Sequence, residues 1–251
     1  MSKPSKLVFP DDFRPDFQGF GPEAFKFLRG IKRHNERAWF QPRKELYDAE
    51  LKFPMECLVA EFGGDRADPG LPVRGDPQKA QFRIYRDVRF SKNKAPYKTH
   101  VGAILSRSGA RGDPGVVYIH IEPGNCRISA GFWRYDAPML AAWRNRMTGN
   151  PKEWLKIIGD YTDPDGETFM RSISSLKTLP RGFKEYADSP VADYLKWKSF
   201  LLSRDIPDEI VASRDIIDII RDHARKAAPL LRYGWEILDA PELADPRRHM
   251  R

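Results

Sequence analysis

The stretch that decides the fold of this chain is Val116-Val117-Tyr118-Ile119-His120-Ile121-Glu122-Pro123-Gly124-Asn125-Cys126-Arg127-Ile128-Ser129-Ala130-Gly131-Phe132-Trp133. Apolar and polar residues alternate on both sides of Pro123-Gly124, which is the pattern of two half-buried strands. A tight turn at Pro123-Gly124 joins the strands as a hairpin. This hairpin predicts a register with His120 opposite Arg127, Ile119 opposite Ile128 and Tyr118 opposite Ser129.

The predicted register separates the residues of the hairpin by chemistry. One face is apolar and carries Val117, Ile119, Ile121, Ile128, Ala130 and Phe132. The other face is polar and carries Tyr118, His120, Glu122, Arg127, Ser129 and Trp133. Because a slip of one residue would exchange the two faces, the apolar face is predicted to lie against the core.

The segments around the hairpin predict further strands and several helices. Besides 116–122 and 126–133, strands are expected at 81–87 and 100–106, one or two short ones within 167–179, and an extended piece at 200–204. Helices are expected from Pro22 to near Asn35, from Pro42 to Gly63 with a kink at Pro54, after Asp136, from Pro151, within 190–206, and from Pro207 with a bend at Pro229. We therefore predict an α+β fold, with an antiparallel sheet of about four or more strands and helices packed mainly on one face.

Length and composition bound the organisation of the chain. With 251 residues, of which 41% are apolar, it can bury one large core. We expect an N-terminal arm at 1–20 that packs through Phe9, Phe13, Phe17 and Phe20, a single domain at 21–240 and a polar tail at 241–251. Two cysteines without a CxxC pair argue against a disulfide framework or a structural zinc site. No long apolar run and no signal peptide is visible, so the expected location is the cytoplasm, away from membranes.

The segment from Phe82 to His100 is strongly basic, in a chain whose formal net charge is +8. It supplies six of the candidate anion-binding residues, and Arg127 of the hairpin is the seventh: Arg83, Arg86, Arg89, Lys92, Lys94, Lys98 and Arg127. Arginine matches the paired oxygens of phosphate and carboxylate, and its charge is not lost by titration. A solvated loop whose charges pair with Asp87 is an equally weighted alternative on composition alone.

His120 and Glu122 are the candidate catalytic residues, because they lie two apart on a strand and so share a face. His100 becomes their neighbour if the strand at 100–106 pairs alongside, and such a set can hold a divalent metal. No HxxxH, HExxH or HxH motif is present, so we predict hydrogen-bonded side chains and no metal site. The sequence also lacks GxSxG, GxGxxG and GxxxxGK[ST], and names no cofactor.

Three aromatic residues are candidates for stacking against a ligand ring: Trp39, Tyr97 and Tyr118. For Trp39 a simpler alternative is favoured. Together with Phe40 it would then form a hydrophobic staple that joins two helices.

Several motifs resemble those of one known family. They are Asn35-x-Arg37-x-Trp39-Phe40, the block from Phe82 to His100, Tyr118-x-His120-x-Glu122-Pro123-Gly124, Pro180-Arg181-Gly182-Phe183 and Lys198-Ser199-Phe200. The chain resembles, over about 20–235, conserved proteins of bacteria and fungi grouped as a domain of unknown function. The resemblance implies no activity, substrate or cofactor. It places the most characteristic residues in the basic block, which favours the binding-site interpretation of that block.

Three functions remain open at this point. The first is binding of, or catalysis on, a phosphorylated or otherwise anionic small molecule on the polar face of the sheet. The second is a nucleic-acid-binding module, and the third is an interaction protein that docks an acidic partner. The sequence does not decide between enzyme and binding protein, nor does it fix the ligand, metal dependence or oligomeric state.

Overall fold

The computed structural model describes residues 14–133, 135–159, 161 and 168–240. Phe17 and Phe20 of the expected arm are buried in the same core as the rest of the chain. Phe9, Phe13 and the expected tail at 241–251 lie outside the described residues. The fold is α+β, as predicted, with one open antiparallel sheet of five strands.

The sheet has the strand order β1-β2-β3-β5-β4. Its strands are β1 (Val101–Ser106), β2 (Val116–Ile121), β3 (Cys126–Phe132), β4 (Thr168–Arg171) and β5 (Phe200–Ile206). The predicted hairpin is confirmed, because β2 and β3 pair in the expected register, including His120 with Arg127. Gly124 closes its turn at a φ of 72°, a value that favours glycine.

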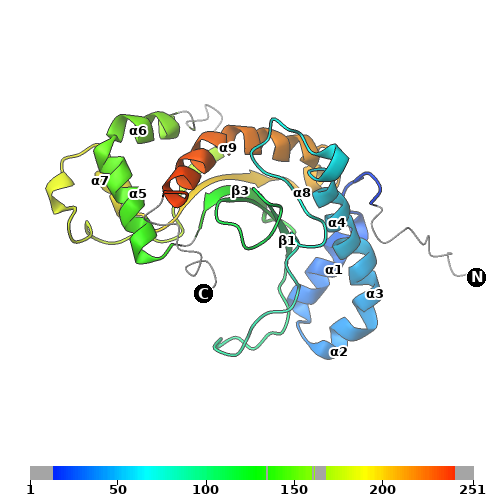
Figure 1. The fold of residues 1–251 in the computed structure, drawn as a ribbon. Coiled ribbons are helices and arrows are strands. Elements are labelled where there is room, and N and C mark those ends of the chain that lie inside the picture. The colour runs from blue at the N-terminus through cyan, green and yellow to red at the C-terminus, as the bar shows by residue number, and fades with distance from the viewer. Residues whose placement is uncertain (1–13, 134, 160, 162–167, 241–251) are drawn as a thin grey trace, which may run out of the picture.

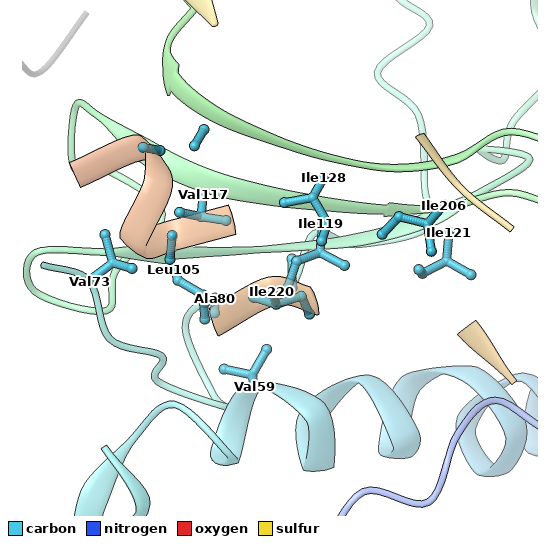
Figure 2. Packing of buried hydrophobic residues seen from close by; sticks show 14 of the residues in the cluster. Val59, Val73, Ala80, Leu105, Val117, Ile119, Ile121, Ile128, Ile206 and Ile220 are labelled. Carbon is cyan, nitrogen blue, oxygen red and sulfur yellow. The ribbon is translucent and has the colours of Figure 1, made fainter. Parts of the chain in front are cut away.

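The core lies on the apolar face of the sheet, under helices α4 (Phe53–Ala60) and α9 (Ile216–Leu238). Figure 2 shows Val59 of α4 and Ile220 of α9 on the same side of the sheet as Ile119 and Ile128. All four side chains are fully buried. Burying a side chain of this kind contributes about 1.5–3 kcal/mol each, so this face fixes the register of the whole sheet.

The other helices lie at the two ends of the sheet (Figure 1). Helix α1 (Pro22–Arg33) lies near α4, and α5 (Ala137–Gly149), α6 (Pro151–Gly159) and α7 (Ala192–Leu195) form a group at the opposite end. Helix α8 (Asp208–Val211) leads from β5 toward α9. None of the helices in the described part of the chain has both the length and the apolar character to cross a membrane.

The second helical region begins earlier than predicted and changes its winding near Pro54. It runs through α2 (Arg37–Phe40), a 3₁₀ turn (Gln41–Arg43), α3 (Lys44–Tyr47), a π-helical turn (Asp48–Lys52) and then α4. Pro54 has no N–H to bond the carbonyl four residues earlier, and the wider π turn lies just before it. The expected interruption at Pro54 therefore takes the form of a π turn.

Helix α9 continues through Pro229, where a bend was predicted. The proline stands inside a helix of 23 residues. The amide of the next residue, Leu230, donates to the hydroxyl of Tyr161 at 3.1 Å. A side chain from outside the helix thus satisfies a backbone donor next to the proline.

One strand prediction needs correction, and another is confirmed and given a place in the sheet. Residues 81–87 form no continuous strand and make only isolated bridges, Gln81 with Ala103 and Tyr85 with Tyr97. The segment pairs instead with residues 96–98, which follow it in the chain, and the amide of Arg86 donates to the carbonyl of Pro96. Because proline has no N–H, Pro96 cannot return a hydrogen bond, and no regular strand pair forms. The piece expected at 200–204 is an inner strand, β5, paired with both β3 and β4.

Candidate functional site on the polar face of the sheet

The polar face of the sheet carries a row of four directly paired residues. Gly102 of β1 pairs with His120 of β2, His120 pairs with Arg127 of β3, and Arg127 pairs with Asp205 of β5. Directly paired residues point to the same side of a sheet. The long basic segment at 82–98 extends away from the sheet beside β1 (Figure 1). This face is therefore where the predicted polar residues meet.

Tyr118 and His120 form a hydrogen-bonded pair on this face. The hydroxyl of Tyr118 lies 3.0 Å from Nδ1 of His120, whose side chain is buried. Gly102 on β1 makes room for this contact, because a Cβ there would lie 2.9 Å from the Tyr118 hydroxyl. Burial raises the pKa of Tyr118 to about 12, so its hydroxyl stays protonated at neutral pH.

Glu122 follows β2, accepts hydrogen bonds from three side chains and lies beside a fourth, His120. Its Oε1 accepts from Thr99 Oγ1 at 3.0 Å and Lys32 Nζ at 3.4 Å, and its Oε2 accepts from Asn125 Nδ2 at 2.8 Å. Oε2 also lies 3.4 Å from Nε2 of His120. Burial raises the pKa of this carboxyl, but the hydrogen bonds from Asn125 and Thr99 outweigh it and lower the pKa to about 2. The side chain is therefore a fixed carboxylate.

His100 lies directly before β1 and packs against His120, with their ring centroids 4.2 Å apart. Burial, together with the charge of His120, lowers the pKa of His100 to about 4. Burial and then the nearby Arg127 also lower the pKa of His120. Both imidazoles are therefore neutral at pH 7 and offer lone pairs to a ligand. The structure thus brings together the two candidate catalytic residues and the histidine that sequence analysis named as their neighbour.

Three cations on or beside this face have no ion pair with any carboxylate of the described residues: Lys98, Arg127 and Arg171. Lys98 lies over the ring of Phe82 at 5.2 Å, and burial followed by the charges of Arg83 and Arg111 lowers its pKa. Nε of Arg171 is buried and has no hydrogen-bond partner among the residues that the structure describes. Elsewhere on the surface, as for Lys79 with Asp76, positive side chains commonly have acidic partners. These three cations thus make no ion pair with a described carboxylate, although Asp205 lies on the same face opposite Arg127 and acts electrostatically on Arg171.

The other members of the basic block do not converge on this face. Arg86 donates to the carbonyl of Ala95 at 2.9 Å and approaches the hydroxyl of Ser91 at 3.5 Å. Lys94 donates to the carbonyls of Val88 and Arg89. Both side chains therefore hold the two arms of the 82–98 segment together, which we call the basic hairpin.

Arg83, Arg89 and Lys92 are exposed. Arg89 makes a bidentate ion pair with Asp87, with N–O distances of 3.0 and 2.8 Å, so its charge is already balanced. The side-chain hydrogen bonds of Arg89, followed by its backbone amide, lower the pKa of Asp87 to about 2. The pairing with Asp87 considered in the sequence analysis is thus present for one arginine of the block.

Arg83 lines a cleft of about 540 Å³ between the basic hairpin and the helical region 37–60. The cations on the helical wall are paired, Lys44 with Asp48 and Lys52 with Glu56. Arg83 and Arg111 on the other wall make no ion pair with a described carboxylate. The cleft meets the polar face at Phe82, which contacts Tyr118 edge-to-face.

The candidate stacking residues differ in their surroundings. Tyr97 is buried, stacks on Phe40 with centroids 4.2 Å apart, and its backbone amide and carbonyl both bond to the side chain of Asn35. Trp39 of α2 contacts Phe27 of α1, stacks on His34 and lies under Arg43, so its ring faces other side chains of the protein. Of the three rings, only that of Tyr118 belongs to the polar face.

Several residues of this face escaped sequence analysis. Gly102, Thr99 and Asn125 stand near the motifs but carried no signal of their own, and Lys32 and Arg171 come from elements far away in the chain. The hairpin register gave one signal for finding such residues. A residue that pairs with His120 or Arg127 across a neighbouring strand lies on the same face of the sheet.

The fold and this face define a class: an α+β protein with an open antiparallel sheet whose polar face carries histidines, carboxylates and cations without an ion pair among the described residues. A family model described as "Conserved hypothetical protein (DUF2461)" matches residues 23–233. The chain belongs to this family, which confirms the resemblance found in its motifs. No curated protein and no solved structure matches the chain significantly.

Proposed function

We propose that the polar face of the sheet binds an anionic small molecule through Lys98, Arg127 and Arg171, with the neutral His100 and His120 between them. The observation that carries the proposal is that these three cations make no ion pair with a carboxylate of the described chain while Glu122, close by, is fully hydrogen-bonded. Partly buried cations of this kind are stabilised by an anion that brings the missing oxygen acceptors.

The chemistry of the three cations favours a phosphoryl or carboxylate group. Arg127 and Arg171 influence each other electrostatically, and their guanidinium groups can donate paired N–H groups to two oxygens of one anion. Lys98 adds a point charge next to the ring of Phe82. The neutral imidazoles of His100 and His120 supply acceptors or donors for hydroxyl groups beside the charged group. A small phosphorylated or acidic metabolite fits this set best.

The proposal is tested by thermal-shift measurements on metal-free protein at low salt. The panel contains inorganic phosphate, a sugar phosphate, a nucleotide and a dicarboxylate at millimolar concentration. At a ligand concentration of 100 times Kd the stabilisation is about 2.7 kcal/mol, which is a measurable shift in Tm. We expect at least one member to stabilise the protein, and we expect Arg127→Gln and Lys98→Gln each to weaken its binding by about 10- to 100-fold.

Lys79→Gln is the matched control for these variants. It removes the same single charge, but from a lysine that is exposed and paired with Asp76. If the effect reflects general attraction of anions to a basic protein, Lys79→Gln will weaken binding as much as Lys98→Gln does. That result, or the absence of any stabilising anion in the panel, would overturn the proposal.

Nucleic-acid binding is a second candidate because of the end of the basic hairpin. Phe90 is 95% exposed there, between Arg89 and the exposed Lys92. An exposed ring among cations is suited to stacking on an unpaired base. Fluorescent single-stranded and duplex oligonucleotides at low salt test it, with Phe90→Ser expected to weaken single-strand binding and to leave small-anion binding unchanged. If neither oligonucleotide binds, this candidate is excluded.

A further inference from the structure

Three metal-ligating side chains converge at one edge of the polar face. His100, His120 and Glu122 each offer one ligand atom here, and these atoms all lie within 4.8 Å of one another. The convergence follows from the sheet: Val101 pairs with Ile121, so His100 and Glu122 lie at the same level just beyond this pair, and His120 lies one step inside it. Two strands thus hold three ligands on one face.

The separation of two of these atoms fits an ion better than a hydrogen bond. Nε2 of His120 and Oε2 of Glu122 are 3.4 Å apart. A hydrogen bond from a neutral imidazole N–H to an oxygen is normally about 2.7–3.2 Å long. Two ligands that each lie about 2.1 Å from a tetrahedral Zn²⁺ are about 3.4 Å apart. The observed distance therefore matches ligands placed around a shared ion.

The surroundings of the ligands support the same conclusion. In the tautomer with its proton on Nδ1, His120 donates to the hydroxyl of Tyr118 and turns the lone pair of Nε2 toward Glu122. Thr99 and Asn125 hold the two oxygens of Glu122 in place. Metal-binding histidines and carboxylates are characteristically oriented by such second partners.

We propose that His100, His120 and Glu122 bind one divalent transition-metal ion, best matched by Zn²⁺, and leave a coordination position open toward the polar face. Two imidazoles and one carboxylate are a ligand set found at catalytic zinc sites, where the remaining position holds water or substrate. The charge of Arg127 beside His120 opposes cation binding, so we expect a micromolar affinity that increases when an anion occupies the open position. The inference shares His100 and His120 with the proposed anion site but does not depend on that function, because none of the three cations is a metal ligand and the test contains no anionic ligand.

The test is titration of untagged, metal-free protein with ZnCl₂ by isothermal calorimetry, in a buffer free of phosphate and carboxylate. We expect one equivalent of Zn²⁺ to bind. His100→Ala, His120→Ala and Glu122→Gln should each weaken binding by about 100-fold, and Tyr118→Phe, which acts only through His120, by about 10-fold. Substitution with Co²⁺ should give the intense visible absorption of a tetrahedral site, which reports the ligand geometry in the unmodified protein.

Two matched controls separate this site from incidental binding. His34→Asn removes an exposed histidine at the end of α1, and Glu23→Gln removes an exposed glutamate paired with Lys26. Both should bind Zn²⁺ as the wild type does. The inference is overturned if the wild type binds no stoichiometric Zn²⁺, or if the His100 and His120 variants, verified as folded by circular dichroism, bind it unchanged. If metal-free protein binds no anion, the proposed function is contradicted, but the Zn²⁺ binding expected here is unchanged.

Discussion

The hydroxyl of Tyr118 lies 3.0 Å from Nδ1 of His120, and the side chain of Tyr118 reaches this position by lying across Gly102 of the neighbouring strand β1. A Cβ at Gly102 would lie 2.9 Å from this hydroxyl and 2.9 Å from the carbonyl oxygen of Ile119. Glycine weakens a strand interior, so its presence in β1 is explained by the side chain that lies across it. The orientation of His120 thus depends on a residue of another strand.

Gly102→Ala should lower the free energy of unfolding by about 1–3 kcal/mol, because the methyl group displaces Tyr118 and presses on the backbone of β2. Urea denaturation measures this change. Gly112→Ala is the control, since a Cβ at Gly112 meets nothing within 4 Å. In long-range ¹H–¹⁵N spectra the imidazole signals of His120 should shift in the Gly102 variant alone. Equal stabilities for the two variants would contradict this account of Gly102.

Arg86→Ala should loosen the basic hairpin and leave the sheet intact. Arg86 bonds to Ala95 across the hairpin, so its loss removes a tie between the two arms. Hydrogen exchange of the amides at 85–97 should accelerate, and exchange in β2 and β3 should stay unchanged. Arg89→Ala is the control, because the pair of Arg89 with Asp87 is exposed and lies within one arm.

The same Arg86→Ala variant also distinguishes structure from binding. If Arg86 acts only within the hairpin, binding of small anions to the polar face should change less than in Arg127→Gln. A variant that loses anion binding with unaltered hydrogen exchange would show instead that Arg86 contacts the ligand directly.

The sequence was sufficient to predict the part of the fold where local pattern and burial agree. The β2–β3 hairpin alternates strictly and carries a turn glycine, so both its register and the chemistry of its faces could be derived. Strand β5 could not be recognised as an inner strand, because Phe200-Leu201-Leu202-Ser203 is buried at every position and shows no alternation. Apolar and polar residues alternate in 81–87, but this segment pairs with the residues around Tyr97 that follow it in the chain. The periodicity of a sequence does not identify such a partner.

Only the residues of the candidate site that lie close together along one strand segment could be predicted from the sequence. The spacing of His120 and Glu122 placed both on one face of β2 without further information. Arg86 and Lys94 illustrate the limit, since a basic block reveals charge and not the backbone carbonyls that these two side chains bind. Contributions from Lys32 and Arg171 depend on long-range packing, for which the sequence carries no local signal.

Glu61→Ala should lower the free energy of unfolding by about 3 kcal/mol. Glu61 is 3% exposed and accepts hydrogen bonds from the guanidinium of Arg214, at 2.9 and 3.1 Å, and from the amide of Phe17 at 2.9 Å. Its removal leaves the buried amide of Phe17 without this acceptor and Arg214, just before α9, without its carboxylate partner. Urea denaturation measures the loss. Glu23→Ala, which breaks an exposed pair with Lys26, should change stability by less than about 0.5 kcal/mol.

His223 should make the protein less stable in mild acid. It lies buried in α9, its Nε2 donates to the carbonyl of Leu202 at 3.2 Å, and its Nδ1 has no hydrogen-bond partner within the described part of the chain. Burial lowers its pKa to about 4, and the facing cations Arg204 and Lys226 act in the same direction. The unfolded chain, with a histidine pKa near 6.5, therefore binds the proton first, so stability is lost as the pH falls from about 6.5 to about 4.

The loss assigned to His223 is on the order of 3 kcal/mol over that whole range, and above about pH 6.5 it disappears. Urea denaturation at a series of pH values between about 7 and about 5 measures it. His223→Gln retains an N–H donor for Leu202 and cannot be protonated, so its stability should fall less steeply in acid than that of the wild type. The pKa of His100 is also lowered, so part of the loss of stability in acid remains in this variant. His34→Gln, at an exposed position, should reproduce the wild-type profile, and a His223→Gln profile as steep as the wild type would contradict the assignment.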